Sequence, residues 1–215
     1  MKITKYPQSA FVIEYKQKKI LIDPGRFCYN EDFTFEHWGD VDILLITHIH
    51  SDHFVPEAVR SISQKNANVI ILTNREVKET LDELDVPCRI LEPNQKVQIG
   101  DITITGVRSI HGPIPGKDEL PNVIGFLIDS KVYHPGDTIY MYNKPKAEIL
   151  MVPISAPVTM GIEGAAKFAK EINPKLIIPM HYDNPKYPED PEEFVKAMEG
   201  YPVRILQNRQ TIMTA

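Results

Sequence analysis

The chain has 215 residues, 42% of them hydrophobic and 25% charged, which is the composition of an ordinary globular protein able to bury a core. The formal net charge of −5 argues against a free-standing nucleic-acid binder, because such proteins usually carry a basic face. An apolar run of about 18 residues, as a membrane span needs, is absent from the sequence. The first residues also lack the apolar segment of a signal peptide, so we expect a cytoplasmic protein without a membrane partner.

The first half of the chain is predicted to be rich in strands. Residues 11–15 and 19–23 are typical of a hairpin, and the Asp23-Pro24-Gly25 turn ends its second strand. The apolar residues 41–46 predict a fully buried strand. Further along we expect a helix over residues 56–64, a buried strand over 69–72, a helix over 75–84 and strand material from 89 to 110.

The second half repeats this rhythm of strands and helices. Thr159 is a candidate N-cap for a helix over residues 160–172, and Asp190-Pro191 begins another helix that Gly200 would stop. The other predicted elements are a hairpin of residues 123–129 and 131–133 and buried strands over 149–153, 175–180 and 203–206.

These two blocks predict an α/β (α+β) protein with two sheets packed together and helices outside. The sequence shows no Gly/Ser-rich linker, low-complexity segment or repeat. We therefore expect one domain over residues 1–215. Cys28 and Cys88 are too few and too isolated for a disulfide framework or a zinc knuckle.

The segment 47–53, Thr-His-Ile-His-Ser-Asp-His, offers four metal-ligating side chains directly after a buried strand. In an extended segment, residues i and i+2 point the same way, so His48 and His50 can bind one ion. Asp52 and His53 lie beyond the bend at Ser51 and can reach a second ion. Three imidazoles and a carboxylate crowded together without a metal would incur repulsion or desolvation costs, so the segment predicts ligation.

Three further candidates follow other predicted strands: His111, Asp137 and His181. Ligands in open α/β folds lie at the carboxyl ends of strands, so these side chains can converge with the first four on one rim. Imidazole and carboxylate donors suit zinc, manganese or iron. Two other histidines remain. For His134 the alternatives are a hydrogen-bond donor behind a metal ligand and a buried hydrogen-bonded residue, of which we favour the second; His37 is interpreted as a surface residue.

In this order and spacing the sequence resembles the metallo-β-lactamase superfamily, whose signature is His-x-His-x-Asp-His, a distant His, Gly-Asp and a final His. The segments 11–14, 21–24, 133–138 and 178–182 are similar to the branch of small metal-dependent hydrolases related to ascorbate-6-phosphate lactonase. The resemblance implies a four-layer αββα sandwich that binds two divalent ions, with zinc preferred and manganese or iron as alternatives. It assigns His48, His50 and His111 to the first ion, Asp52, His53 and His181 to the second, and Asp137 as the bridge.

One segment departs from the pattern of that branch. The branch usually carries a Gly-His-Ser-like segment near the first hairpin, whereas this chain has Pro7-Gln8-Ser9. A glutamine amide can donate or accept a hydrogen bond but cannot titrate near neutral pH. This difference leaves the predicted metal ligands untouched and bears only on how far the substrate preference of that branch carries over to this chain.

The expected activity is that of a metal-dependent hydrolase in which a metal-bridging hydroxide attacks a small ester, lactone or phosphoester. Asp52 is the candidate catalytic residue, which orients the nucleophile and shuttles a proton. The alternatives are a phosphodiesterase of nucleotide or phospholipid type, an iron-dependent redox enzyme, and a catalytically silent metal-binding module. We expect the substrate to be a small molecule, which can be anionic, and we expect no nucleic-acid partner. The chain can form a homo-oligomer.

Overall fold

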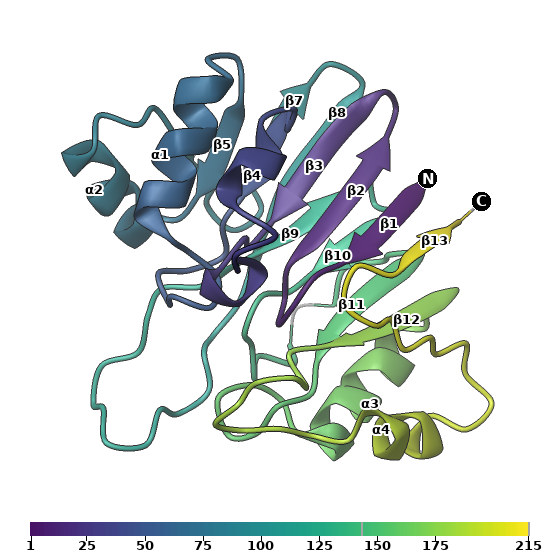
Figure 1. Ribbon diagram of the computed structural model, residues 1–215. Coiled ribbons are helices and arrows are strands. Elements are labelled where there is room, and N and C mark those ends of the chain that lie inside the picture. Colours follow the sequence, from purple (N-terminus) through teal and green to yellow (C-terminus); the bar gives the residue numbers. More distant parts are fainter. Residues whose placement is uncertain (143, 215) are drawn as a thin grey trace. The chain divides into compact units, whose positions relative to one another are not determined.

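The computed structural model describes residues 1–142 and 144–214, and the chain forms two compact units (Figure 1). The first unit comprises residues 1–91 and 207–214, so the last residues of the chain return to the unit in which it began. The second unit comprises residues 92–206. The prediction of a single domain stays a prediction, and the two units are described separately.

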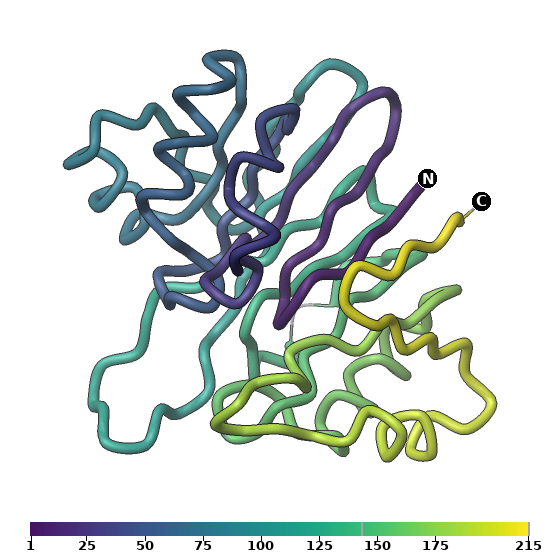
Figure 2. The backbone as a smooth tube through the Cα atoms, in the orientation of Figure 1, coloured from purple at the N-terminus to yellow at the C-terminus, as the bar shows by residue number. Residues whose placement is uncertain are grey.

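The first unit contains a seven-stranded sheet in the order β13-β1-β2-β3-β4-β5-β6. Its strands from β1 to β3 are antiparallel, and those from β3 to β6 are parallel. Strand β13 pairs antiparallel with β1, so the two ends of the chain lie side by side (Figure 2). The strands are β1 (Lys2–Lys5), β2 (Phe11–Tyr15), β3 (Lys18–Ile22), β4 (Ile43–Leu45), β5 (Ile70–Thr73), β6 (Arg89–Ile90) and β13 (Thr211–Met213).

The register of the parallel strands places the candidate ligands of this unit at one edge of the sheet. Ile22 pairs with Leu45, and Leu45 pairs with Leu72, so β3, β4 and β5 end in one row. Residues that follow this row therefore leave the sheet together. They include Asp23 after β3 and the segment 47–53 after β4, as expected for ligands outside the carboxyl ends of strands.

Two helices cover one face of this sheet, α1 (Pro56–Lys65) and α2 (Arg75–Glu83) (Figure 1). Pro56 occupies the first turn of α1, where a missing N–H costs nothing, and Asn74 caps α2 by accepting a hydrogen bond from Val77 N. Two short 3₁₀ helices, η1 (Arg26–Cys28) and η2 (Phe35–Trp38), lie between β3 and β4. The buried core on this face joins strands and helices through Val12, Leu21, Leu44, Ile71, Val59, Ile62, Val77 and Leu81.

The second unit contains a six-stranded sheet in the order β12-β11-β10-β9-β8-β7. Its strands are β7 (Lys96–Ile99), β8 (Ile102–Arg108), β9 (Ile124–Ile128), β10 (Val132–His134), β11 (Ile149–Pro153) and β12 (Leu176–Met180). Strands β8 and β10 both pair antiparallel with β9, and β10, β11 and β12 are parallel, so β8, β10, β11 and β12 run in one direction. The segments that follow β8, β10 and β12 therefore leave the sheet at the same edge.

Helices α3 (Ile162–Ile172) and α4 (Pro191–Ala197) belong to the second unit and pack on its sheet. Asp190 caps α4 by accepting a hydrogen bond from Glu192 N, as predicted from the sequence. The core includes Tyr133, Leu150, Val152, Ile177, Phe168 and Phe194. In the part of the chain that the structure describes, none of the helices is long and apolar enough to cross a membrane.

Two local predictions were wrong. Thr159 does not cap α3, whose N-cap is Gly161; the Thr159 hydroxyl instead accepts a hydrogen bond from Ser155 N (2.9 Å) and so stabilises the preceding turn. The segment 203–206 is not a strand, because it contributes only an isolated bridge between Val203 and Ile177. Strands β1 and β13, which pair at the edge of the first sheet, were not predicted.

Candidate metal centre

The segment 47–53 of the first unit is anchored by a buried carboxylate. Asp23 is 0% exposed and accepts hydrogen bonds from Thr47 N (2.7 Å) and the Thr47 hydroxyl (2.6 Å). The Asp23 oxygen that accepts from the Thr47 hydroxyl, Oδ2, also accepts a hydrogen bond from His53 Nδ1 (2.8 Å). Asp23 therefore fixes both ends of the ligand segment, at Thr47 and at His53.

This hydrogen-bond chain determines which ring nitrogen of each histidine carries the proton. The carboxylate of Asp23 can only accept, so His53 Nδ1 is protonated and His53 Nε2 presents its lone pair. The Thr47 hydroxyl donates to Asp23, so its oxygen accepts from His48 Nδ1 (3.0 Å). His48 Nε2 therefore also presents a lone pair, and a carboxylate behind a ligating histidine is the usual arrangement in metal sites.

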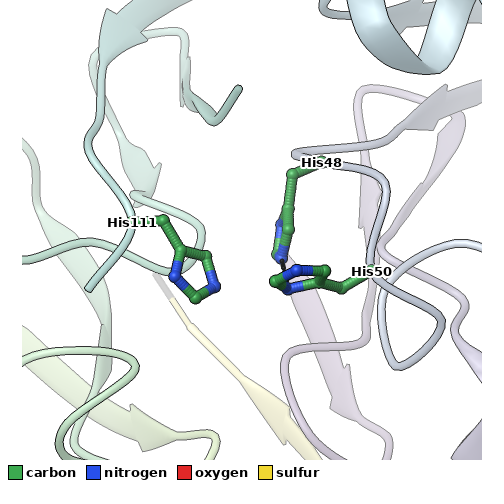
Figure 3. A group of neighbouring side chains, drawn as sticks. All are labelled: His48, His50 and His111. Carbon is green, nitrogen blue, oxygen red and sulfur yellow. Dashed lines mark hydrogen bonds between the residues drawn. The ribbon is translucent and has the colours of Figure 1, made fainter. Parts of the chain in front are cut away.

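His48 and His50 point toward one another, as their i, i+2 spacing predicts (Figure 3). His48 Nε2 lies 3.0 Å from His50 Nδ1, and the two ring centroids are 4.7 Å apart. The ring of His53 also lies close to His48, with a centroid separation of 4.1 Å. Asp52 approaches the same ring, with Oδ2 3.9 Å from His53 Nε2. All four predicted ligands of this unit thus form one group.

A glycine permits this segment to approach the turn after β3. A Cβ atom on Gly25 would lie 1.8 Å from the carbonyl oxygen of Asp52 and 2.4 Å from His53 N. Arg26 N donates a hydrogen bond to Ser51 O (2.7 Å) and holds the two backbones together. Only glycine fits at this contact. The Asp23-Pro24-Gly25 turn therefore not only ends β3 but also packs against the backbone of the ligand segment.

The second unit brings its three predicted ligands together around Asp137. His111 follows β8, Asp137 follows β10 and His181 follows β12, and all three side chains are buried. The Asp137 Oδ2 atom lies 3.0 Å from His181 Nε2 and 3.7 Å from His111 Nε2. One carboxylate oxygen therefore faces two imidazole nitrogens, as a ligand shared between two sites would.

The backbone around two of these residues is constrained. His111 Nδ1 donates to the carbonyl oxygen of Gly112 (2.6 Å), which can only accept, so His111 Nε2 presents its lone pair. A Cβ on Gly112 would lie 2.2 Å from Pro157 O, so the chain after His111 also requires glycine. His181 has a φ of +66°, a conformation that costs about 1 kcal/mol or more for a residue with a side chain and that often marks a functional site.

These donor atoms fit divalent cations that prefer nitrogen and oxygen. Two ligand atoms on one tetrahedral zinc ion, each about 2.0–2.1 Å from the metal, lie about 3.3–3.4 Å from one another. Within each unit the separations between donor atoms run from 3.0 to 3.9 Å, close to that spacing. All seven predicted residues belong to the His and Asp groups able to bind a metal: His48, His50, Asp52, His53, His111, Asp137 and His181.

The remaining histidines behave as predicted. His134 is 0% exposed and accepts a hydrogen bond from Gly136 N (3.2 Å), which confirms a buried hydrogen-bonded residue. His37 is exposed, stacks on Phe33 with a centroid distance of 4.5 Å, and accepts a hydrogen bond from Thr34 N.

Gln8 is a buried residue near the predicted ligands, and Tyr182, next to His181, is partly buried. Gln8 is buried with a φ of +58° in the turn between β1 and β2; since Phe11 pairs with Ile22, this turn lies at the same sheet edge as Asp23. Tyr182 donates a hydrogen bond from its hydroxyl to Leu206 O (2.7 Å), and burial raises the pKa of this phenol to about 12.

Asp23 and Thr47 are the functional residues that sequence reasoning missed. Asp23 was assigned only to a turn, although it is an acidic residue directly after a buried strand, the same signal that identified Asp137. A hydroxyl one residue before the first ligand is a weaker signal. Its role becomes visible only when the parallel register brings the ends of β3 and β4 together.

Comparisons with known proteins agree with this chemistry. The family model described as "Beta-lactamase superfamily domain" matches residues 2–181. A "UPF0173 metal-dependent hydrolase" of Archaeoglobus fulgidus is 32% identical, with 93% of this chain and 91% of the relative covered. A protein of the same description from Caldivirga maquilingensis is 31% identical, with 89% and 87% covered.

Solved structures share the fold. A metallo hydrolase from the archaeon Ignicoccus hospitalis superposes with a TM-score of 0.77 over 98% of this chain and 97% of its own, at 24% identity. An isothiocyanate hydrolase from Delia radicum gut bacteria superposes with a TM-score of 0.78 over 100% and 99%, at 22% identity. The likeness at these identities concerns the fold, a mixed α/β architecture that in residues 1–142 and 144–214 has two sheets and four α-helices.

The fold and the buried His/Asp groups define a class, that of metal-dependent hydrolases with a metallo-β-lactamase fold. The chain belongs to the metallo-β-lactamase superfamily and, within it, to the small metal-dependent hydrolases that the archaeal relatives represent. The predicted fold class and the predicted superfamily are therefore confirmed.

Proposed function

We propose that the ligands of the two units together hold two divalent cations, and that this hydrolase cleaves a small ester or lactone. The observation that carries the proposal is the orientation of three imidazoles, His48, His53 and His111, whose Nδ1 protons are each committed to an acceptor. The first ion would take His48, His50 and His111, the second Asp52, His53 and His181, and Asp137 would bridge them.

The bound ions would act as Lewis acids and activate a water molecule at neutral pH. The chain's own contribution is to keep each imidazole neutral, with the lone pair of its Nε2 atom available to a metal. The hydrogen bonds of Asp23 and Thr47 do this for His48 and His53. In the reaction the water oxygen bonds to the carbonyl carbon, the ester C–O bond breaks, and the leaving oxygen receives a proton.

Asp52 is the residue best placed to carry that proton. Five of the seven proposed ligands are buried, whereas Asp52 and His50 are partly exposed. The side chain of Asp52 is 18% exposed, so its carboxylate can exchange protons with solvent or with a leaving group. We propose zinc as the resident ion, with manganese or iron as alternatives, since nitrogen and oxygen ligands serve all three.

The test compares hydrolysis of p-nitrophenyl esters, a lactone panel and bis-p-nitrophenyl phosphate by metal-free and metal-loaded protein. We expect turnover of esters or lactones only after loading, and loss of turnover by at least 100-fold in Asp52→Asn with metal still bound. The matched control is Asp40→Asn, because the Asp40 carboxyl is 72% exposed and pairs with the surface residue Lys19 instead of a proposed ligand. Preference for the phosphodiester would favour the phosphodiesterase alternative, and oxygen-dependent turnover with iron would favour the redox enzyme.

Inactivity of the metal-loaded protein on the whole panel would contradict the proposed hydrolysis of esters and lactones. It would favour a silent metal-binding module.

A further inference from the structure

A group of apolar side chains on the second unit is exposed to solvent. Ile110 is 38% exposed, Ile139 is 42% and Tyr142 is 88%, and Tyr140 is partly exposed beside them. We call these four residues the apolar wall. Single exposed apolar residues are normal in proteins, but a contiguous group usually marks a binding surface.

The wall is a defined structure that two backbone segments build. Ile139 N donates a hydrogen bond to Ile110 O (2.8 Å), so the two isoleucines belong to neighbouring segments. The buried Thr138 hydroxyl accepts hydrogen bonds from Ile110 N (3.3 Å) and Tyr140 N (2.9 Å) and fixes both segments. The rings of Tyr140 and Tyr142 lie 5.6 Å apart.

The charged side chain beside the wall is held against it. The Arg108 guanidinium carbon lies 5.5 Å from the centroid of the Tyr140 ring, a cation–π contact that orients this ring. Arg108 and Ile110 lie two residues apart and are both exposed, whereas Ser109 between them is buried. The segment 108–110, at and beyond the end of β8, thus exposes Arg108 and Ile110.

The wall adjoins two of the proposed metal ligands in the sequence. Ile110 directly precedes His111, and Ile139 follows Asp137 by two residues. Both ligands are nearly inaccessible, at 1% and 2% exposure, while their neighbours on the wall are open to solvent. Ile110 and Ile139 are therefore the first solvent-exposed residues next to these ligands along the chain, and substrate atoms that stay outside the buried ligands would contact them there.

We infer that the apolar wall binds the apolar part of the hydrolysed molecule, which makes the substrate an ester or lactone with an alkyl or aryl group. This inference rests on the proposed function, because it takes His111 and Asp137 as metal ligands. The wall consists of carbon-rich surface, and burial of each methylene of a substrate against it is favourable. A small, highly charged substrate would leave this surface exposed.

The experiment uses hydroxamates, which chelate a metal ion through a common head group and differ only in their tail. Acetohydroxamate and octanohydroxamate are titrated into the metal-loaded protein by calorimetry, so the readout is binding and not turnover. We expect the octanoyl compound to bind about tenfold or more tightly, since its tail adds six methylenes that the open wall covers only in part. In the variant Ile110→Ser/Ile139→Ser this ratio should fall to about threefold or less.

Two comparisons keep the result interpretable. Acetohydroxamate should bind the double variant as tightly as the unchanged protein, which shows that the metal ligands are intact. Met213→Ser removes an apolar side chain that is 73% exposed on β13 of the first unit, and it should leave both affinities unchanged.

The remaining outcomes overturn the inference. Equal binding of both hydroxamates to the unchanged protein, or the same affinity ratio in the double variant as in the unchanged protein, would show that the wall does not bind substrate while the metal centre stands. Dissociation of an oligomer in the double variant, seen by size-exclusion chromatography, would assign the wall to a contact between copies. Failure of both hydroxamates to bind the metal-loaded protein would remove the proposed metal centre itself, and the inference with it.

Discussion

Replacement of Asp23 by asparagine should uncouple the ligand segment from the sheet. The Asp23 carboxylate accepts three hydrogen bonds in a fully buried position, two from Thr47 and one from His53. An asparagine can retain the bond from Thr47 N through its oxygen. Its amide group would then face two further donors, the Thr47 hydroxyl and His53 Nδ1. His53 could relieve this conflict by moving its proton to Nε2, and the lone pair that a metal requires would be lost.

The size of the effect follows from these contacts. The loss of an outer partner of a ligating histidine typically costs 10–100-fold in metal affinity. A hydrogen bond to a charged group contributes about 1.5–3 kcal/mol, and two are lost, so we expect the free energy of unfolding to fall by about 3–6 kcal/mol. Competition titration of zinc against a chelating dye measures the affinity, and urea denaturation of metal-free protein measures the stability.

Asp42→Asn is the matched control for this experiment. Asp42 belongs to the same unit and accepts hydrogen bonds from Lys18 Nζ (2.7 Å) and Lys19 N (2.8 Å), but it is partly exposed. We expect little change in metal affinity in this variant. Wild-type zinc affinity in a folded Asp23→Asn protein would refute the hydrogen-bond chain as the device that orients His48 and His53.

Three further predictions concern the same unit. Thr47→Val should lower zinc affinity about tenfold whereas Thr47→Ser should retain it, because only the hydroxyl links His48 to the carboxylate; equal affinities in the titration would contradict this. Gly25→Ala should lower both the melting temperature and the bound zinc, measured by scanning calorimetry and elemental analysis, because a Cβ would overlap the backbone of the ligand segment. Gly39→Ala, whose nearest neighbour would lie at 3.5 Å, should change neither. Burial raises the pKa of the Asp42 carboxyl, but its hydrogen bonds outweigh burial and hold the pKa below the usual 3.8. Asp42→Asn should therefore lower the free energy of unfolding by its full amount at pH 7. This difference from the unchanged protein should disappear as the pH falls below 3.8 through the folded-state pKa. A difference that urea denaturation shows to be independent of pH would contradict the pKa shift.

The sequence predicted which His and Asp side chains gather within each unit, because the ends of buried strands can be recognised in it; that they bind metal stays a prediction. A buried apolar run followed by His or Asp marks the point where a side chain leaves a sheet, and this signal identified His111, Asp137 and His181. The spacing of His48 and His50 predicted that their rings meet, and the structure confirms a contact of 3.0 Å between ring nitrogens.

The features that escaped prediction depend on pairing between distant segments. Strand β13 exists because the last residues of the chain pair with β1, a contact that no local pattern signals. Asp23 gained its role only from the register between β3 and β4. The segment 203–206 is apolar enough to be a strand, but its pairing stops after one bridge at Val203. Tertiary pairing decided each of these cases over local propensity.

The central claim is that residues from both units bind the same pair of cations. It is tested most directly by a crystal structure of the zinc-loaded protein with anomalous diffraction recorded at the zinc absorption edge. We predict two anomalous peaks about 3.5–4 Å apart, each bound both by a residue of the segment 48–53 and by at least one of His111, Asp137 and His181. A single peak bound by the first unit alone, with the three residues of the second unit bound to no metal, would contradict the account.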